Sequence, residues 1–267
     1  MSQPLAYIHP EAKIAKNVVI EPFANIEKDV EIGEGTWIGS NVTIMEGARI
    51  GKNCRIFPGA VISAIPQDLK FAGEKTIARV GDNVTIREFV TLNRGTKASW
   101  ETVVGDNTLL MAYVHVAHDC IIGKGCILAN CAQLAGHVVI GDYAILGGIT
   151  AVHQFVRIGA HVMIAGGSLV RKDVPPFTLA AREPLSYTGV NSIGLKRRGF
   201  TNEQINDIQD IYRLVFLNNH SISHALGIIE TERPSTPERD EILAFLSQSK
   251  RGIMKGYSGK DEALEDD

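Results

Sequence analysis

The 267-residue chain has little of what would place it on nucleic acid, in a membrane or outside the cell. Its 27 basic residues nearly balance its 30 acidic ones, so no general attraction to nucleic acid or to an anionic surface is expected. No apolar run approaches the ~18 to 20 residues of a membrane span. The first residues lack the basic and apolar segments of a signal peptide. The four cysteines have no metal-ligand spacing and fit a reducing compartment. We therefore expect a cytoplasmic protein without a membrane span.

A six-residue repeat fills most of the chain. Every sixth position from residue 8 is isoleucine, ten times in succession: Ile8, Ile14, Ile20, Ile26, Ile32, Ile38, Ile44, Ile50, Ile56 and Ile62. The same phase returns from Val80 to Leu92 and from Val104 to Val170. The phase positions Asp68, Glu74 and Ala98 break it, so we expect loops near 63–79 and 93–103.

A second phase, four residues after each aliphatic residue, is almost always small, and Gly, Asn or Asp often fills the turns. This pattern predicts a parallel β-helix, in which the large residue points inward and the small one fits beside it. Three rungs make a coil of 18 residues, and stacked coils bury one another. About nine coils would span roughly 40 Å. Cys54, Cys120 and Cys126 occupy the small phase, so we expect core packing rather than nucleophilic chemistry.

The repeat ends at Pro175 and Pro176, and helical patterns follow. Thr201 and Gln204 resemble a capping box that precedes an apolar stripe at helical spacing. Two more helices are expected over 221–231 and 237–248, before an acidic end that should be frayed. We therefore divide the chain into a β-helix at 1–190 and a helical domain at 191–267.

Four histidines fall within one stretch of the repeat: His115, His118, His137 and His153. The 18-residue period makes His118, Gly136 and Gln154 vertical neighbours and sets His137 over Asp119. We expect these side chains at outward-facing turns of one edge.

Two chemistries are open for such an edge. Zinc binding by three histidines occurs in β-helix carbonic anhydrases, but the close histidine spacing of that family is missing. General base catalysis by a neutral imidazole needs only one histidine and a donor for the oxyanion. A backbone N–H beside Gly136 is a candidate donor. Serine-hydrolase elbows and phosphate-binding loops are absent from the sequence.

Five segments resemble the bacterial UDP-N-acetylglucosamine O-acyltransferases of the hexapeptide-repeat acyltransferases: QDLKFAGE (67–74), HVAHDC (115–120), LAGH (134–137), AVHQF (151–155) and GVNSIGLKRRGF (189–200). The resemblance runs to about Phe200 and more loosely through the helices. It implies a left-handed parallel β-helix, a homotrimer with active sites between subunits, and no metal or cofactor. It also implies transfer of an (R)-3-hydroxyacyl chain from acyl carrier protein to the 3-hydroxyl of UDP-N-acetylglucosamine, the first step of lipid A biosynthesis.

The resemblance also suggests roles for individual residues. His118 would be the general base, Asp119 would orient it, and Gly136 would supply the oxyanion N–H. Contacts to the sugar nucleotide would come from Asp68, Lys70, His115, His137, His153 and Gln154. Residues near the phosphates and the acyl donor would be Asn191, Arg197 and Arg198, since the arginine fork suits phosphate. The acidic carrier protein would meet this basic cluster together with Lys196, Arg171 and Lys172.

Gly166 holds the position of a residue that measures acyl-chain length in this family, so we expect an open groove and a donor of about fourteen carbons or more. Two departures concern nucleotide recognition. Glu183 and Pro184 stand where some relatives have a histidine, and Ile193 replaces a polar residue.

Two other functions stay open at this level. A sister family acylates a glucosamine amine, but it carries an N-terminal uridine-binding domain, for which a repeat beginning at Ile8 leaves no room. A non-catalytic scaffold would need neither the histidine edge nor the loop with Asp68 and Lys70. Alternatively, Asp68 and Lys70 could form only an exposed ion pair that contributes under ~1 kcal/mol to stability.

Overall fold

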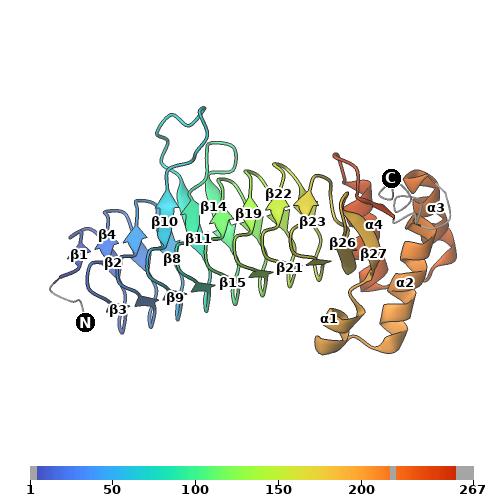
Figure 1. The fold of residues 1–267 in the computed structure, drawn as a ribbon, viewed down its shortest axis with the longest axis horizontal. Coiled ribbons are helices and arrows are strands. Elements are labelled where there is room, and N and C mark those ends of the chain that lie inside the picture. Colours follow the sequence, from blue (N-terminus) through green and yellow to red (C-terminus); the bar gives the residue numbers. More distant parts are fainter. Residues whose placement is uncertain (1–4, 217–220, 257–267) are drawn as a thin grey trace, which may run out of the picture.

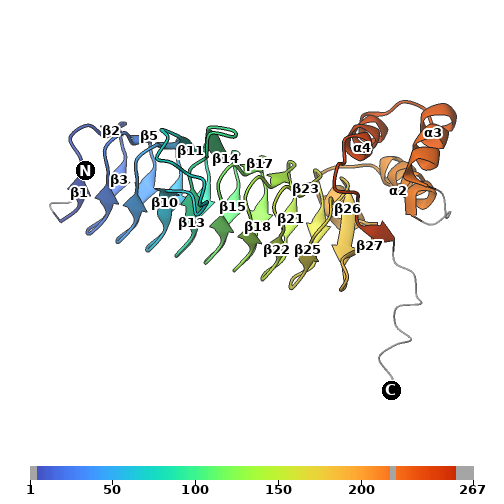
Figure 2. The same cartoon turned by 90° about the horizontal axis from the view of Figure 1, so that it is seen from above.

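A long three-sided prism of short strands leads into a cluster of helices at one end (Figures 1 and 2). This computed structural model describes residues 5–216 and 221–256. The acidic end that we expected to be frayed lies outside the described residues. No helix in the described ranges is long and apolar enough to cross a membrane.

Three sheets form the sides of the prism, and each coil contributes one short strand to each sheet. The first sheet contains β1 (Tyr7–Ile8), β4 (Asn25–Ile26), β7 (Thr43–Ile44), β10 (Val61–Ala64), β13 (Thr91–Asn93), β16 (His115–Val116), β19 (Gln133–Leu134), β22 (Ala151–Val152) and β25 (Leu169–Val170). The second contains β2 (Lys13–Ile14), β5 (Glu31–Ile32), β8 (Ala48–Ile50), β11 (Ile77–Val80), β14 (Glu101–Val104), β17 (Ile121–Ile122), β20 (Val139–Ile140) and β23 (Arg157–Ile158). The third contains β3 (Val19–Ile20), β6 (Trp37–Ile38), β9 (Arg55–Ile56), β12 (Thr85–Ile86), β15 (Leu109–Leu110), β18 (Ile127–Leu128), β21 (Ile145–Leu146) and β24 (Met163–Ile164).

The strands of each side pair in parallel, one coil apart. Tyr7 faces Asn25, and His115 faces Gln133, which is the predicted step of 18 residues. The nine strands of the first sheet, counted over the described residues, confirm the expected number of coils. The architecture is the left-handed parallel β-helix that the repeat and the resemblance predicted.

The two phases of the repeat fill the interior as predicted. Ile26, Ile38 and Ile44 have no exposed surface, and the small residues beside them are equally buried. Cys54, Cys120 and Cys126 lie in this core, and burial raises the pKa of the Cys120 thiol to about 12. The cysteines therefore pack as small apolar groups, as expected.

The corners of the prism use left-handed backbone. Asn17, Asn53 and Asn107 have positive φ angles, as turn residues commonly do. Other corner positions hold aromatic rings that stack on the next coil. Tyr143 stacks on His161 with ring centroids 5.2 Å apart, and His161 stacks on Phe177 at 5.6 Å. Rings at equivalent corner positions therefore stack on one another across neighbouring coils.

The chain leaves the prism twice, between β10 and β11 and between β13 and β14, and both loops rise from the same edge (Figure 1). The first loop spans 65–76 and the second 94–100. They contact each other where the Arg94 guanidinium lies 5.6 Å from the centre of the Phe71 ring. Both therefore cover one edge of the middle coils.

Within the part of the chain that the structure describes, four helices follow the prism: α1 (Ser192–Arg197), α2 (Asn202–Phe216), α3 (Ile222–Glu232) and α4 (Pro237–Ser247). The capping box at α2 is confirmed, because Thr201 N donates to Gln204 Oε1 and Gln204 N donates to Thr201 Oγ1. The short α1 and the hairpin of β26 (Thr178–Ala181) and β27 (Ser186–Val190) were not anticipated from the sequence. We propose 190/191 as the boundary between the two parts, since β27 ends there.

The last described segment returns to the prism. β28 (Lys255–Gly256) pairs in parallel with β27, and Asp173 forms an isolated bridge with Ile253. The segment after α4 therefore ties the helices to the final coil.

Candidate active site

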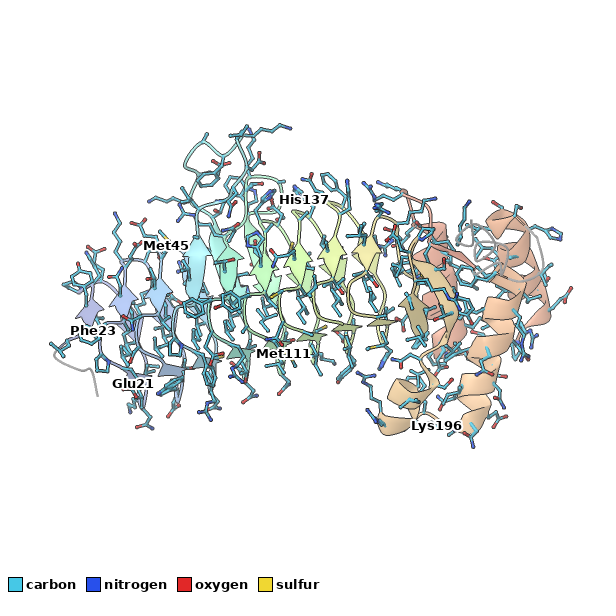
Figure 3. All side chains as sticks on the ribbon, viewed as in Figure 1. Glu21, Phe23, Met45, Met111, His137 and Lys196 are labelled. Atoms are coloured by element: carbon cyan, nitrogen blue, oxygen red, sulfur yellow. The ribbon has the colours of Figure 1, made fainter. Side chains whose placement is uncertain are left out.

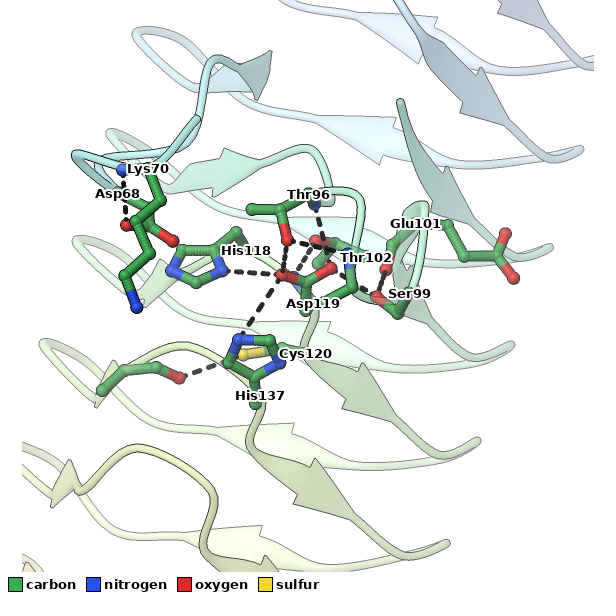
Figure 4. A network of polar contacts seen from close by, with 12 residues as sticks. Asp68, Lys70, Thr96, Ser99, Glu101, Thr102, His118, Asp119, Cys120 and His137 are labelled. Carbon is green, nitrogen blue, oxygen red and sulfur yellow. Dashed lines mark hydrogen bonds and ion pairs between the residues drawn. The ribbon is translucent and has the colours of Figure 1, made fainter. Parts of the chain in front are cut away.

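A buried histidine–aspartate pair lies under the two loops. Both residues follow β16, at the corner where the chain turns from the first sheet to the second. Asp119 has a φ angle of 59°, and His118 Nδ1 lies 2.8 Å from Asp119 Oδ2 (Figure 4). We expected an outward-facing turn. The side chains do project from the prism, but only 7 % of His118 and 3 % of Asp119 is exposed, because the loops fold over this edge.

The Asp119 carboxylate is surrounded by donors. Burial alone would raise its pKa, but hydrogen bonds from Ser99, His118 and Thr96 outweigh burial and lower the pKa to about 2. An ionised carboxylate only accepts hydrogen bonds, so His118 Nδ1 must carry the proton in their shared bond. In the neutral imidazole His118 Nε2 is then an acceptor, which is the form that a general base requires.

Gly136 lies directly beside the His118 ring, which confirms the predicted vertical stacking. A Cβ added at Gly136 would come within 2.5 Å of His118 Cε1, so only glycine fits. No hydrogen bond among the described residues uses the Gly136 N–H. A free backbone donor next to the imidazole is able to stabilise an oxyanion.

His137 completes this edge over Asp119, as the period predicted. Its Nε2 lies 3.7 Å from Asp119 Oδ2, and its ring stacks on Phe155 with centroids 4.6 Å apart. Burial lowers the pKa of His137, partly offset by the Asp119 charge. His137 is therefore neutral near pH 7, and its ring can donate one hydrogen bond and accept another.

The first loop places polar groups on the other side of the His118 ring. Figure 4 shows Asp68 and Lys70 beside that ring, on the side away from Asp119. Lys70 N donates to Asp68 Oδ1 at 3.0 Å. His115 lies at the start of this corner, where its Nδ1 is 2.7 Å from Thr91 Oγ1, and burial lowers its pKa. The predicted loop pair therefore lies beside His118, and His115 lies at the start of the same corner.

His118, Asp119 and His137 also offer ligand atoms within 4.8 Å of one another, a spacing that could hold a metal ion. Asp119 Oδ2 is, however, already an acceptor for both His118 Nδ1 and Thr96 Oγ1. A metal bound at this group would have to displace those protons. The hydrogen-bonded pair accounts for the geometry without one.

The remaining predicted residues lie elsewhere on the chain. His153 is exposed and Gln154 partly exposed, one coil above Gly136. Asn191 caps α1, since its side chain accepts from Gly194 N and donates to the His161 carbonyl. Figure 3 shows Lys196 at the helical end, on the side of the molecule opposite the edge that carries His137. A single chain therefore does not bring α1 to His118.

Some basic residues of the predicted cluster are exposed, whereas others are bound to groups of the same chain. Arg197, Lys196 and Lys172 are exposed. Arg198 is held by the prism, because its Nη2 donates to the Tyr143 carbonyl at 2.9 Å. Arg171 pairs with Glu183 at 2.8 Å. Glu183, which stands where some relatives have a histidine, thus has a partner within the chain.

A cavity of about 590 Å³ opens beside His137 and contains residues that the sequence reasoning missed. It runs past Phe155 and Arg157 to Lys250 and Arg251. The repeat could not reveal this, because Lys250 and Arg251 follow α4 and reach the prism only through tertiary folding. The cavity links the histidine edge to a basic surface.

Gly166, the expected chain-length position, lies exposed at a corner of the last coils. A Cβ there would come within 3.1 Å of the Gly148 carbonyl oxygen, one coil below. The corner is therefore open to solvent and closely packed only toward the prism.

A prism of six-residue rungs with a buried histidine–aspartate pair on its edge defines a hexapeptide-repeat transferase. The family model for bacterial transferase hexapeptide repeats matches residues 29–64 and 101–136. The model for domain 2 of UDP-N-acetylglucosamine O-acyltransferase matches residues 173–254. The chain belongs to the UDP-N-acetylglucosamine O-acyltransferase family.

Individual relatives place it firmly there. The acyl-(acyl-carrier-protein)–UDP-N-acetylglucosamine O-acyltransferase of Chlorobaculum parvum is 62 % identical over 193 residues, which are 72 % of this chain and 73 % of the relative. That of Chlorobaculum tepidum is 58 % identical over 201 residues, 74 % and 76 % of the two chains. The crystal structure of a UDP-N-acetylglucosamine acyltransferase from Bacteroides fragilis superposes with a TM-score of 0.94 at 52 % identity, covering 96 % of this chain and 100 % of that one.

Proposed function

We propose that this protein transfers an (R)-3-hydroxyacyl chain from acyl carrier protein to the 3-hydroxyl of UDP-N-acetylglucosamine, the first step of lipid A biosynthesis. The single observation that carries this proposal is the buried His118–Asp119 pair with the free Gly136 N–H beside it. The names of the 62 % and 58 % identical relatives specify the acyl carrier and the sugar nucleotide. We place the reaction in the cytoplasm, since both substrates are soluble and polar.

The chemistry follows from the proton positions. His118 Nε2 takes the proton of the sugar hydroxyl as its oxygen attacks the thioester carbonyl carbon. The Gly136 N–H stabilises the negative oxygen of the tetrahedral intermediate. Collapse of the intermediate breaks the carbon–sulfur bond, and the thiolate takes the proton from the His118 imidazolium. Asp119 stabilises that imidazolium, because it stays ionised throughout.

The sugar nucleotide would bridge two chains of a homotrimer. Asp68, Lys70 and His137 lie around His118 and, together with His115, would hold the N-acetylglucosamine. His153 and Gln154 lie farther along the same edge and would contact the nucleotide. Asn191, Arg197 and Arg198 lie away from this edge in one chain and would reach the phosphates and acyl donor from a neighbouring subunit. A mass near three times 29.0 kDa in solution would support the trimer, and a monomer would contradict it.

The acyl carrier would dock where basic residues surround the exit from the active site. Lys250 and Arg251 line the cavity that begins at His137. The exposed Lys172 lies one residue from Asp173, which also lines that cavity, while Lys196 and Arg197 are exposed on α1. An acidic carrier protein would be attracted to such a surface, and the attraction would weaken with salt.

The test is an acyl-transfer assay with 3-hydroxyacyl carrier protein and UDP-N-acetylglucosamine. We expect His118→Ala to lower kcat by about 100- to 10,000-fold, the range for a lost general base. His9→Ala, in the first coil, is the matched control and should keep full activity. Absence of product with every acyl chain length would refute the function. Full activity in His118→Ala would refute only the role of His118 as the general base.

Chain length gives a second test. Gly166 leaves its corner open, so the wild-type protein should accept a long chain of about fourteen carbons or more. The resemblance places the end of the acyl groove at this corner, where a larger side chain would take up space that glycine leaves open. Gly166→Met should therefore shift the preference among donors toward shorter chains, and Gly166→Ala should do so less. Unchanged selectivity in competition assays would reject this role.

A further inference from the structure

The loop at 94–100 supplies donors to Asp119 beyond its histidine partners. Thr96 N donates to Asp119 Oδ1 at 2.9 Å, and Thr96 Oγ1 donates to Oδ2 at 2.7 Å. Ser99 Oγ donates to Oδ1 through a short bond. Both carboxylate oxygens are therefore held from one loop, and neither Thr96 nor Ser99 belongs to the repeat.

This loop is itself fixed in place. Gly95 N donates to the Ile77 carbonyl on β11, and Trp100 N donates to the Thr96 carbonyl. A Cβ at Gly95 would come within 2.4 Å of Glu101 N, so the loop lies tightly against β14. Its hydroxyl groups thus hold defined positions over the carboxylate.

The orientation of the carboxylate decides which nitrogen of His118 carries the proton. Asp119 Oδ2 accepts from both Thr96 Oγ1 and His118 Nδ1. Rotation of the carboxylate would break the bond to Nδ1, after which the imidazole could carry its proton on Nε2 instead. That tautomer has no lone pair on Nε2 and cannot act as the base.

We propose that Thr96 and Ser99 are positioning residues for the reaction, holding Asp119 so that His118 keeps its proton on Nδ1. Neither side chain has a hydrogen bond to a His118 nitrogen among the described residues, so their effect on the imidazole passes through Asp119. Their other hydrogen bonds stay in or next to the loop, where Thr96 Oγ1 accepts from Ala98 N and Ser99 Oγ lies 2.9 Å from the Glu101 carbonyl oxygen. The inference rests on the proposed function for its kinetic consequence but not for its structural one. Binding of the sugar nucleotide should not depend on either hydroxyl, so kcat should change while KM does not.

The kinetic test compares Thr96→Val, which removes the hydroxyl at constant shape, with Thr96→Ser, which keeps it. We expect Thr96→Val to lower kcat roughly tenfold, as for one lost hydrogen bond to a charged group. KM for UDP-N-acetylglucosamine should stay within about twofold, and Thr96→Ser should restore kcat. Ser99→Ala should act in the same direction.

A double-mutant cycle separates positioning from simple structural support. In the background of Asp119→Ala, Thr96→Val should have almost no further effect, because its target is gone. The matched control is Thr108→Val, which removes an equally buried hydroxyl that donates to the Gly123 carbonyl away from the site. An equal loss of kcat in both backgrounds, no loss in either, or the same loss in Thr108→Val would overturn the proposal.

A structural readout distinguishes failure of this proposal from failure of the proposed function. Nitrogen NMR of ¹⁵N-histidine protein reports the tautomer, with His118→Ala identifying the signal. The wild-type ring should carry its proton on Nδ1, and Thr96→Val combined with Ser99→Ala should populate both tautomers. An unchanged tautomer would overturn the positioning role even in an active enzyme. The expected tautomer change in a protein that transfers no acyl group would refute only the function.

Discussion

Single residues on the edges of the prism have tightly limited space, and Gly136 shows this most clearly. The coil spacing brings its Cα against the ring of His118, so glycine is required there by the contact and not by its backbone angles. The sequence alone indicated that the two residues stack. The closeness of the contact is what would connect this glycine to the proposed chemistry.

Gly136→Ala should lower kcat by at least about 100-fold, the loss typical of a damaged oxyanion hole. The added methyl group would force the His118 ring away from its bond with Asp119, since it would lie 2.5 Å from Cε1. Steady-state kinetics would measure the loss, and circular dichroism should show an intact prism. Gly227→Ala on α3, where an added Cβ has no neighbour within 4 Å, is the control. Retained activity in Gly136→Ala would contradict the proposed role of the glycine.

His161 is a second residue whose surroundings limit it strongly, here by shifting its pKa. Burial and, to a smaller extent, the positive charge of Arg198 lower its pKa to about 4, with Asp142 opposing the shift. Its Nδ1 is buried without a hydrogen-bond partner among the described residues. Between pH 6.5 and 4 the unfolded chain binds a proton at this residue and the folded chain does not. Stability is therefore full above pH 6.5 and is lost as the pH falls through this window.

His161→Phe should reduce that loss, because phenylalanine does not titrate and can keep the stack with Tyr143 and Phe177. Because of this histidine, the free energy of unfolding of the wild-type protein should be about 2 kcal/mol lower at pH 5 than at pH 8. Thermal unfolding at both pH values would measure the difference, with His9→Phe as the control. Equal pH dependence of Tm in wild type and His161→Phe would contradict the shift.

Residue-scale prediction from the sequence had a clear limit. The period placed His118, Gly136, Asp119 and His137 correctly relative to one another, because a strict repeat fixes which side chains stack. It did not indicate that Asp119 is buried and held by Thr96 and Ser99. Those residues lie in an interruption of the repeat, where no periodicity specifies which way a loop folds.

Among the elements, the segment after α4 fastens the helices to the prism. Asp173 is almost fully buried in the final coil, where its carboxylate accepts from Arg157 N and from Ser249 Oγ. Its backbone also exchanges hydrogen bonds with Gly252 and Met254. One side chain thus links a prism strand, a corner and the returning segment.

Asp173→Ala should lower the free energy of unfolding by about 2–4 kcal/mol, since two donors lose a charged acceptor in a buried place. Urea denaturation would measure the loss. Asp173→Asn should lose less, because its amide oxygen can still accept one of the bonds. The exposed Asp207 on α2 provides the control, and its replacement by alanine should change stability by under ~0.5 kcal/mol. A similarly small effect of Asp173→Ala would show that the attachment does not depend on this carboxylate.

The elements that the sequence predicted are those with a local signal. α2 was expected from its capping box and apolar stripe, and α3 and α4 begin near the expected positions. Such local signals are missing for three elements: the hairpin of β26 and β27, the short α1, and β28. The strands β26, β27 and β28 pair only because the end of the prism offers an open sheet edge, and this depends on tertiary structure.

The whole molecule is stabilised by contacts between adjacent coils, so a coil at either end depends on what covers it. The two ends differ in this respect. The C-terminal coil is covered by the hairpin and the helices, as Figure 2 shows. The first described coil has a neighbour on one side only, and Ile8 and Ile14 remain partly exposed there. In such stacked structures stability is a sum over units and their neighbours.

Hydrogen exchange should therefore be graded along the prism. Backbone amides of the first coil should exchange well before those of the coils between Val104 and Val170, because opening the end breaks contacts with one neighbour only. Mass spectrometry of exchanged peptides would measure the gradient. Uniform protection from residue 7 onward would show that the N-terminal coil is covered by something else, such as another copy of the chain.

The 18-residue coil also limits how such a molecule can change in length during evolution. Between His118 and Asp173, adding one complete coil would extend the prism by about 4.8 Å and keep every side chain on its original face. Adding a single six-residue rung would instead turn everything beyond it by a third of a revolution, carrying the basic end away from the histidine edge. Growth or loss within this interval should therefore come in whole coils, whereas the loops at 65–76 and 94–100 are free to vary residue by residue.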